Sequence, residues 1–119
     1  MSHQPTGAKR WLRNRRSERI ELRVPCVIYR PAGEGPPFYE NTQTLVVNAH
    51  GALISLKGLV ATKQRLLLQN TNSGEQQECR VVSINNERTG PSKVAVEFTR
   101  ASPRFWRVAY PPFDWTTSN

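Results

Sequence analysis

The sequence lacks most of the features that identify enzymes, membrane proteins and metal sites. No apolar run approaches the ~18 residues that a membrane-spanning helix needs, and glycine follows no period. With only two cysteines and no Cys-x-x-Cys pair, a disulfide-rich scaffold is excluded. The Gly-x-Ser-x-Gly, His-Glu-x-x-His and P-loop sequences are also missing, and His3 and His50 lack the spacing of metal ligands. We therefore expect neither an enzyme nor a bound metal or cofactor.

Cys26 and Cys79 lie far apart in the chain. We interpret them as reduced core thiols of a cytoplasmic protein, and a disulfide between them is the open alternative. No apolar segment follows the basic N-terminus, so the sequence shows no sign of a secretion signal.

Positive charge is concentrated at the N-terminus. The net charge is +8, and residues 1–30 hold eight arginines and lysines against two glutamates, a net of +6. Arginine outnumbers lysine, which favours bidentate recognition of phosphate or guanine. A basic arm on a nearly neutral body indicates an anionic partner, whereas a merely solubilising tail is the alternative.

Short apolar segments separated by turn sequences predict an all-β fold. From Ile20 to Tyr29 apolar residues alternate with mostly polar ones, which is the pattern of a half-buried strand. Residues 31–42 are rich in proline and glycine and are expected to form a loop. The other predicted strands are Thr44–Val47, Ala52–Leu56, Arg65–Gln69, Gln76–Ile84 and Lys93–Phe98. Six short strands and almost no helical period predict an antiparallel barrel or a sandwich.

The two ends of the chain differ in character from this body. We expect residues 1–13 to be a flexible basic tail, 14–102 the barrel, and 103–119 an aromatic C-terminal helix and tail. Ser102 can cap a short helix that reaches about Tyr110, before two prolines end it. Five of the ten aromatic residues lie between Phe105 and Trp115. We expect them to cover the open end of the barrel, or alternatively to form a partner-docking surface with Trp106 and Trp115 as its anchors.

Just before the first predicted strand lies the cluster Arg15-Arg16-Ser17-Glu18-Arg19. Arg15 and Arg19 form an Arg-x-x-x-Arg spacing; Arg19 and Arg23 form another, although Arg23 falls inside the predicted strand. With the segments RRSERIELRVPCVIY, VVNAHGALISL and KVAVEF, residues 14–110 resemble the PilZ domain family.

This resemblance implies a six-stranded barrel that binds the bacterial second messenger cyclic di-GMP. The family's Arg-x-x-x-Arg motif corresponds to Arg15 and Arg19, with Arg16 beside them. Its second motif, (Asp/Asn)-x-Ser-x-x-Gly, corresponds to Gly51, with Asn48 at the serine position. Val46 stands where the family has Asp or Asn. The resemblance thus implies a ligand site that includes Arg15, Arg16, Arg19, Asn48 and Gly51.

The chemistry of these residue types suits the ligand. Arginine can bond a phosphate, pair with the guanine edge or stack on the base. We expect Gly51 to supply a positive φ in its hairpin and the Asn48 amide to donate and accept. The predicted protein is a small cytoplasmic cyclic di-GMP receptor or adaptor, with a possible protein partner. A PilZ-like barrel that acts as a ligand-independent interaction module is the alternative, and general nucleic-acid binding by the arm is the third.

Overall fold

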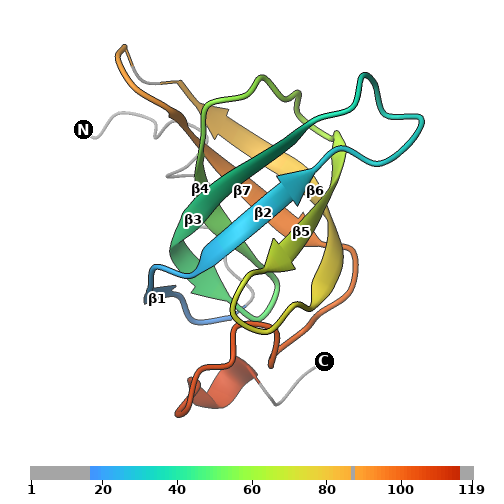
Figure 1. Ribbon diagram of the computed structural model, residues 1–119. Helices are drawn as coiled ribbons and strands as arrows, with labels where there is room; N and C mark the ends of the chain where they lie inside the picture. Colours follow the sequence, from blue (N-terminus) through green and yellow to red (C-terminus); the bar gives the residue numbers. More distant parts are fainter. Residues whose placement is uncertain (1–16, 87, 116–119) are drawn as a thin grey trace.

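The computed structural model describes residues 17–86 and 88–115, whose regular secondary structure consists almost entirely of β-strands (Figure 1). Over this range the elements are β1 Ile20–Glu21, β2 Pro25–Tyr29, β3 Tyr39–Asn48, β4 Gly51–Leu56, β5 Arg65–Asn70, β6 Gln76–Asn85, β7 Ser92–Phe98 and the 3₁₀ helix η1 Phe113–Trp115. In the part of the chain so described, no helix has the length and apolar character to cross a membrane.

The strands close into a six-stranded antiparallel barrel, as the sequence predicts. The hydrogen-bonded order is β3-β2-β5-β6-β7-β4, and β4 pairs back onto β3 to close the ring (Figure 1). The short strand β1 lies outside this ring order: it pairs with Val46 and Val47 near the C-terminal end of β3, past the residues that pair with β2. Strand β3 is therefore flanked by β4 along one edge and by β2 and β1 in succession along the other.

The first predicted strand is divided by an irregularity at residues 22–24. Here the buried hydroxyl of Thr44 on β3 takes the place of a backbone group in the hydrogen bonding between the strands. It donates to the carbonyl of Leu22 (2.6 Å) and accepts from the amide of Val24 (2.8 Å). Because the side chain replaces backbone partners, the chain shifts register against β3, and Arg23 is exposed at the interruption. Strand β3 itself begins at Tyr39, inside the segment expected to be a loop.

The inward side chains form one continuous apolar core. Alternation along the strands supplies it, as expected for a sheet with one face buried. Both Cys26 and Cys79 lie in this core as free thiols, which agrees with the interpretation of reduced cysteines. Its largest fully buried members are Ile28, Ile54, Leu56, Leu66, Leu68, Val47, Val81, Val94 and Val96.

The C-terminal segment covers one end of the barrel without forming the predicted helix. Residues 103–106 make a turn, and the only helix in the described range is η1. Both Phe105 and Trp106 point into the core, with ring centroids 5.1 Å and 5.8 Å from Phe98. In the predicted helix Trp106 and Tyr110 would share a face, whereas Tyr110 is 93% exposed. Packing of adjacent rings on Phe98 thus overrides the local helix signal.

Candidate functional site

A hollow of about 540 Å³ opens beside β1 on the outer side of the barrel. Its floor is apolar, because Leu45, Val46 and Leu53 belong to a small cluster separate from the barrel core. Leu45 and Val46 both face outward because the pairing of β3 with β4 is irregular between Thr44 and Val46, whereas the next residues, Val47 and Ala52, face the core. The residues that line the hollow are Glu21, Leu22, Arg23, Leu45, Val46, Leu53 and Lys93.

Charged side chains stand at the rim of this hollow. Arg23 and Lys93 contribute two positive charges, and Glu21 contributes one negative charge. An apolar floor with a net positive rim suits a ligand that combines a flat ring with an anionic group. A nucleotide has this combination, since its base can lie on apolar side chains while arginine bonds the phosphate.

Strand pairing brings the chain that follows the arginine-rich segment to this hollow, although Arg19, Asn48 and Gly51 do not line it. In β1, Ile20 pairs with Val47 and Glu21 pairs with Val46, the residue at the Asp/Asn position of the second motif. The arginine-rich segment ends one residue before β1, where Arg19 is half-buried. The other two predicted arginines, Arg15 and Arg16, lie outside the described residues.

Arg23 is a site candidate that the sequence interpretation placed inside a strand. Its side chain lies on the exposed face, in alternation with Leu22 and Val24, and lines the hollow. A signal for it was present in the sequence, because Arg19 and Arg23 also have the Arg-x-x-x-Arg spacing. The interruption of the strand next to Arg23 depends on the Thr44 hydroxyl, twenty residues from Val24 in sequence, and no local pattern predicts it.

Asn48 is a buried anchor of the β3–β4 turn. Only 3% of it is exposed, and each of its polar groups is bonded: the side-chain amide donates to the Ser17 carbonyl (3.3 Å), its oxygen accepts from the His50 amide (2.9 Å), and its own carbonyl accepts from the Trp106 indole (2.9 Å). A ligand would reach the Asn48 side chain only by displacing one of these partners.

Gly51 is required by close packing and not by a left-handed backbone. The expected positive φ is wrong, because Gly51 is absent from the glycines with positive φ. A Cβ at this position would lie 2.0 Å from the carbonyl oxygen of Val96 on the neighbouring strand β7. Glycine therefore allows β4 to approach β7 at the turn that carries Asn48.

Around this turn the two ends of the described chain meet, in what we call the terminal junction: residues 17–18, the turn 48–50, Trp106 and residues 114–115. The Ser17 hydroxyl lies 3.2 Å from the Ala49 amide, which donates to it. The Asp114 carboxylate accepts from the Glu18 amide (3.0 and 3.1 Å), and the Trp115 indole donates to the Glu18 carbonyl (2.6 Å). The end of the arginine-rich segment is thus bonded to the C-terminal segment.

The core thiols offer no reactive group to this site. Burial raises the pKa of Cys26 to about 12, and burial, with smaller contributions from nearby Glu78 and Cys26, raises the pKa of Cys79 to about 12. Among residues 17–86 and 88–115, no three His, Cys, Asp or Glu side chains gather in a way that could hold a metal ion. What the site offers chemically is recognition of an anion beside an apolar surface.

Comparison with known proteins gives a family and a fold. The model of the PilZ domain family matches residues 13–108. Among solved structures, the chain is similar to the inhibitor of motility MotI/DgrA of Bacillus subtilis, with a TM-score of 0.57 and 17% sequence identity over 75% of this chain and 44% of that chain. The chain thus spans less than half of that protein's chain, and at this identity the similarity establishes the fold alone. No curated protein matches the sequence.

Proposed function

The chain belongs to the PilZ domain family, and from this premise we propose that it is a small cyclic di-GMP receptor that acts as a non-enzymatic adaptor in the bacterial cytoplasm. The observation that carries the proposal is the pairing of β1 with β3, which joins the end of the arginine-rich segment to Val46 at one hollow. Val46 of the second motif lines this hollow, and Arg23, which lies four residues after Arg19, stands at its rim.

The proposed roles follow from the chemistry of each side chain. Arg15, Arg16 and Arg19 approach the ligand from the segment before β1, and Arg23 approaches it from the rim of the hollow. Each can bond a phosphate or the guanine edge. Asn48 and Gly51 act from behind, because they fix the turn against which the segment is bonded.

The terminal junction provides a route from ligand to output. If the arginine-rich segment contacts a nucleotide, Ser17 and Glu18 within it must keep or exchange their bonds to the turn at Ala49 and to Asp114 and Trp115. A change at Glu18 is therefore transmitted directly to the C-terminal segment, and this alters the surface that a partner protein meets.

The test is a calorimetric titration of the full chain with cyclic di-GMP. Loss of one charge-assisted bond costs about 1.5–3 kcal/mol, so Arg19→Ala and Arg23→Ala should each lower the affinity by roughly ten- to a hundredfold. Arg88→Ala is the matched control, since Arg88 is exposed in the β6–β7 turn. A thermal melt of each variant separates lost binding from lost folding. Equal affinity in wild type, Arg19→Ala and Arg23→Ala would contradict the assignment.

A second candidate function is a barrel that acts as a ligand-independent interaction module. Two observations favour it: Val46 offers no hydrogen-bonding group at the hollow, and the polar groups of Asn48 are already bonded inside the protein. Absence of any heat with cyclic di-GMP in a folded wild-type chain would support this candidate. The variant Val46→Asp then tests whether residue 46 lies at a nucleotide site. If it does, a regained bond to a guanine should raise the affinity for cyclic di-GMP by roughly ten- to a hundredfold.

A further inference from the structure

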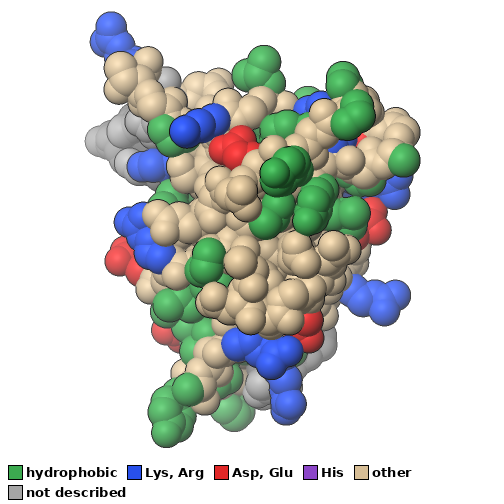
Figure 2. Space-filling view, in the orientation of Figure 1, with side chains coloured by type: hydrophobic (Ala, Val, Ile, Leu, Met, Phe, Trp, Pro, Cys, Tyr) green, Lys and Arg blue, Asp and Glu red, His purple; other side chains and the backbone are tan. Residues whose placement is uncertain are grey.

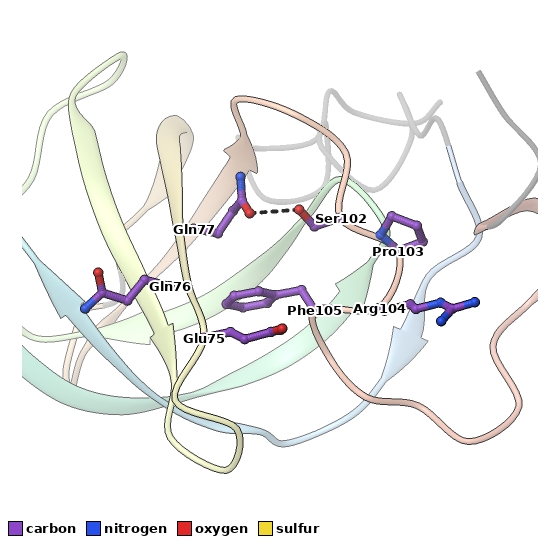
Figure 3. Close-up of a pocket in the computed structure, with 7 residues that line it drawn as sticks. All are labelled: Glu75, Gln76, Gln77, Ser102, Pro103, Arg104 and Phe105. Atoms are coloured by element: carbon purple, nitrogen blue, oxygen red, sulfur yellow. Dashed lines mark hydrogen bonds between the residues drawn. The ribbon is translucent and has the colours of Figure 1, made fainter.

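A second surface, remote in sequence from the arginine-rich segment, has the form of a peptide groove. Two adjoining hollows of about 400 and 640 Å³ share Glu75, Pro103 and Arg104. Together they run between the start of β6 and residues 102–111. Figure 3 shows the first of them, with the Phe105 ring between Glu75 and the hydrogen-bonded pair Gln77 and Ser102.

Apolar groups line the far half of this groove and project at its end. Val108, Ala109 and Pro111 line the larger hollow, and beyond it Tyr110 is 93% exposed and Phe113 is 83% exposed. Figure 2 shows hydrophobic side chains gathered at the lower tip of the molecule, over the C-terminal segment that Figure 1 draws in orange-red. Exposed hydrophobic side chains that gather on one part of a surface are typical of surfaces that bind other proteins.

This segment is held in place, so its rings are presented at low entropic cost. The buried rings of Trp106 and Trp115 fix both of its ends. Between them, Pro111 and Pro112 restrict the backbone dihedral φ. A preorganised segment loses little conformational freedom when a partner binds.

The groove also carries positive charge that the protein does not neutralise internally. Within residues 17–86 and 88–115, no hydrogen bond or ion pair engages the exposed guanidinium of Arg104. Arg107 pairs with Glu75 at 3.3 Å, and both side chains are about half exposed. Arg107 has a φ of 59°, a left-handed conformation in which glycine would be relaxed. Because an exposed ion pair contributes little to stability, the arginine at this strained position points to a partner.

We propose that the groove formed by Glu75, Pro103, Arg104, Arg107, Val108 and Pro111 binds an acidic segment of a partner protein. One apolar side chain of that segment enters the groove and contacts Tyr110, while its carboxylates meet Arg104 and Arg107. Charge complementarity identifies the partner's chemistry, since Arg104 and Arg107 outweigh the single carboxylate of Glu75 in the groove. An anionic membrane fits less well, because the surface is a concave groove and not a plane.

This inference extends the adaptor part of the proposed function, and it can be tested independently of the nucleotide. A library of random twelve-residue peptides is displayed on phage and selected on the immobilised full chain, with and without cyclic di-GMP. Binding of the selected peptides is then measured by fluorescence anisotropy. We expect acidic sequences with one apolar residue, and at least a tenfold loss of their affinity in Arg104→Glu and in Tyr110→Ser.

Matched controls carry the same chemical changes elsewhere. Arg88→Glu reverses an exposed charge in the β6–β7 turn, and Leu59→Ser removes a side chain that is 89% exposed; neither should affect binding. Selection of peptides that are not acidic, or that bind Arg104→Glu and Tyr110→Ser as tightly as wild type, would overturn the proposal. The proposal would also be overturned if no acidic peptide binds and the chain instead binds, in a Tyr110-dependent way, to phosphatidylcholine vesicles with 30 mol% phosphatidylserine, roughly a physiological surface charge. Failure of nucleotide binding alone would leave the peptide result interpretable, since both are measured separately.

Discussion

Replacing Gly51 by alanine introduces a methyl group that the contact between β4 and β7 cannot hold. The new Cβ would lie 2.0 Å from the carbonyl oxygen of Val96 and 3.0 Å from the Cα of Glu97. Both neighbours are backbone atoms of the paired strand, so no side-chain rotation relieves the overlap. The strands themselves must separate.

The cost follows from this separation. Because contacts of a Cβ under 3.0 Å essentially never occur, the strands must part by about 1 Å. The adjacent bond from the Phe98 amide to the His50 carbonyl, now 2.7 Å, would then exceed hydrogen-bonding distance. A lost buried bond costs about 1–3 kcal/mol and the steric adjustment about 1–3 kcal/mol more. We expect the free energy of unfolding to fall by about 4 kcal/mol, which lowers the melting temperature by roughly 20 °C.

The assay is thermal and urea unfolding of Gly51→Ala beside a matched control. Gly74 has a φ of +81° and nothing within 4 Å of a built Cβ, so Gly74→Ala tests backbone strain without a clash. It should cost about 1 kcal/mol. A Gly51→Ala variant that melts at or above the temperature of Gly74→Ala would refute the close-packing account of Gly51.

Three further predictions concern the core and the terminal junction. Trp106→Phe removes the indole donor and leaves a buried carbonyl without its partner, so the free energy of unfolding in urea should fall by about 1–3 kcal/mol; an unchanged midpoint would contradict this role. Burial raises the pKa of Cys26 and Cys79 from 9.0 to about 12, so both thiols should resist a thiol reagent at pH 8 in the native protein. The free energy of unfolding should fall as the pH rises from about 9 to 12, because only the unfolded chain ionises in that range. Prompt labelling of the native protein would show that the thiols are accessible. Asp114→Ala should accelerate hydrogen exchange at the Glu18 amide by roughly tenfold, and equal rates would mean that the carboxylate does not hold it.

The barrel was predictable from sequence because its strands carry the signal of alternation. From Gln76 to Asn85 and from Ser92 to Phe98, β-branched residues and turn sequences gave the elements within a few residues. The first half of β3 was not predicted as a strand, because Tyr39–Gln43 is mostly polar and its sequence is typical of a loop. It becomes a strand only through its pairing with β2, which no local pattern contains.

The parts that could not be predicted depend on single long-range contacts. The division of the first strand needs the Thr44 hydroxyl, and the loss of the expected C-terminal helix needs packing on Phe98. The sequence identified the turn at Asn48 and Gly51 as important, but it could not show how. Both residues are now seen to hold the turn together, one by its hydrogen bonds and the other by allowing β4 to approach β7.

These contacts connect the two surfaces of the molecule through one bonded network. Ser17 and Glu18 of the arginine-rich segment are bonded to the 48–50 turn and to Asp114 and Trp115. Trp115 in turn closes the segment that carries the exposed ring of Tyr110. Because Asp114 and Trp115 bond the amide and the carbonyl of Glu18, an anion that moved Glu18 would have to break or stretch bonds to the C-terminal segment. Binding of a nucleotide and binding of a partner would then be coupled by a change in the hydrogen bonds of Glu18 at the end of the barrel, without movement of the barrel strands.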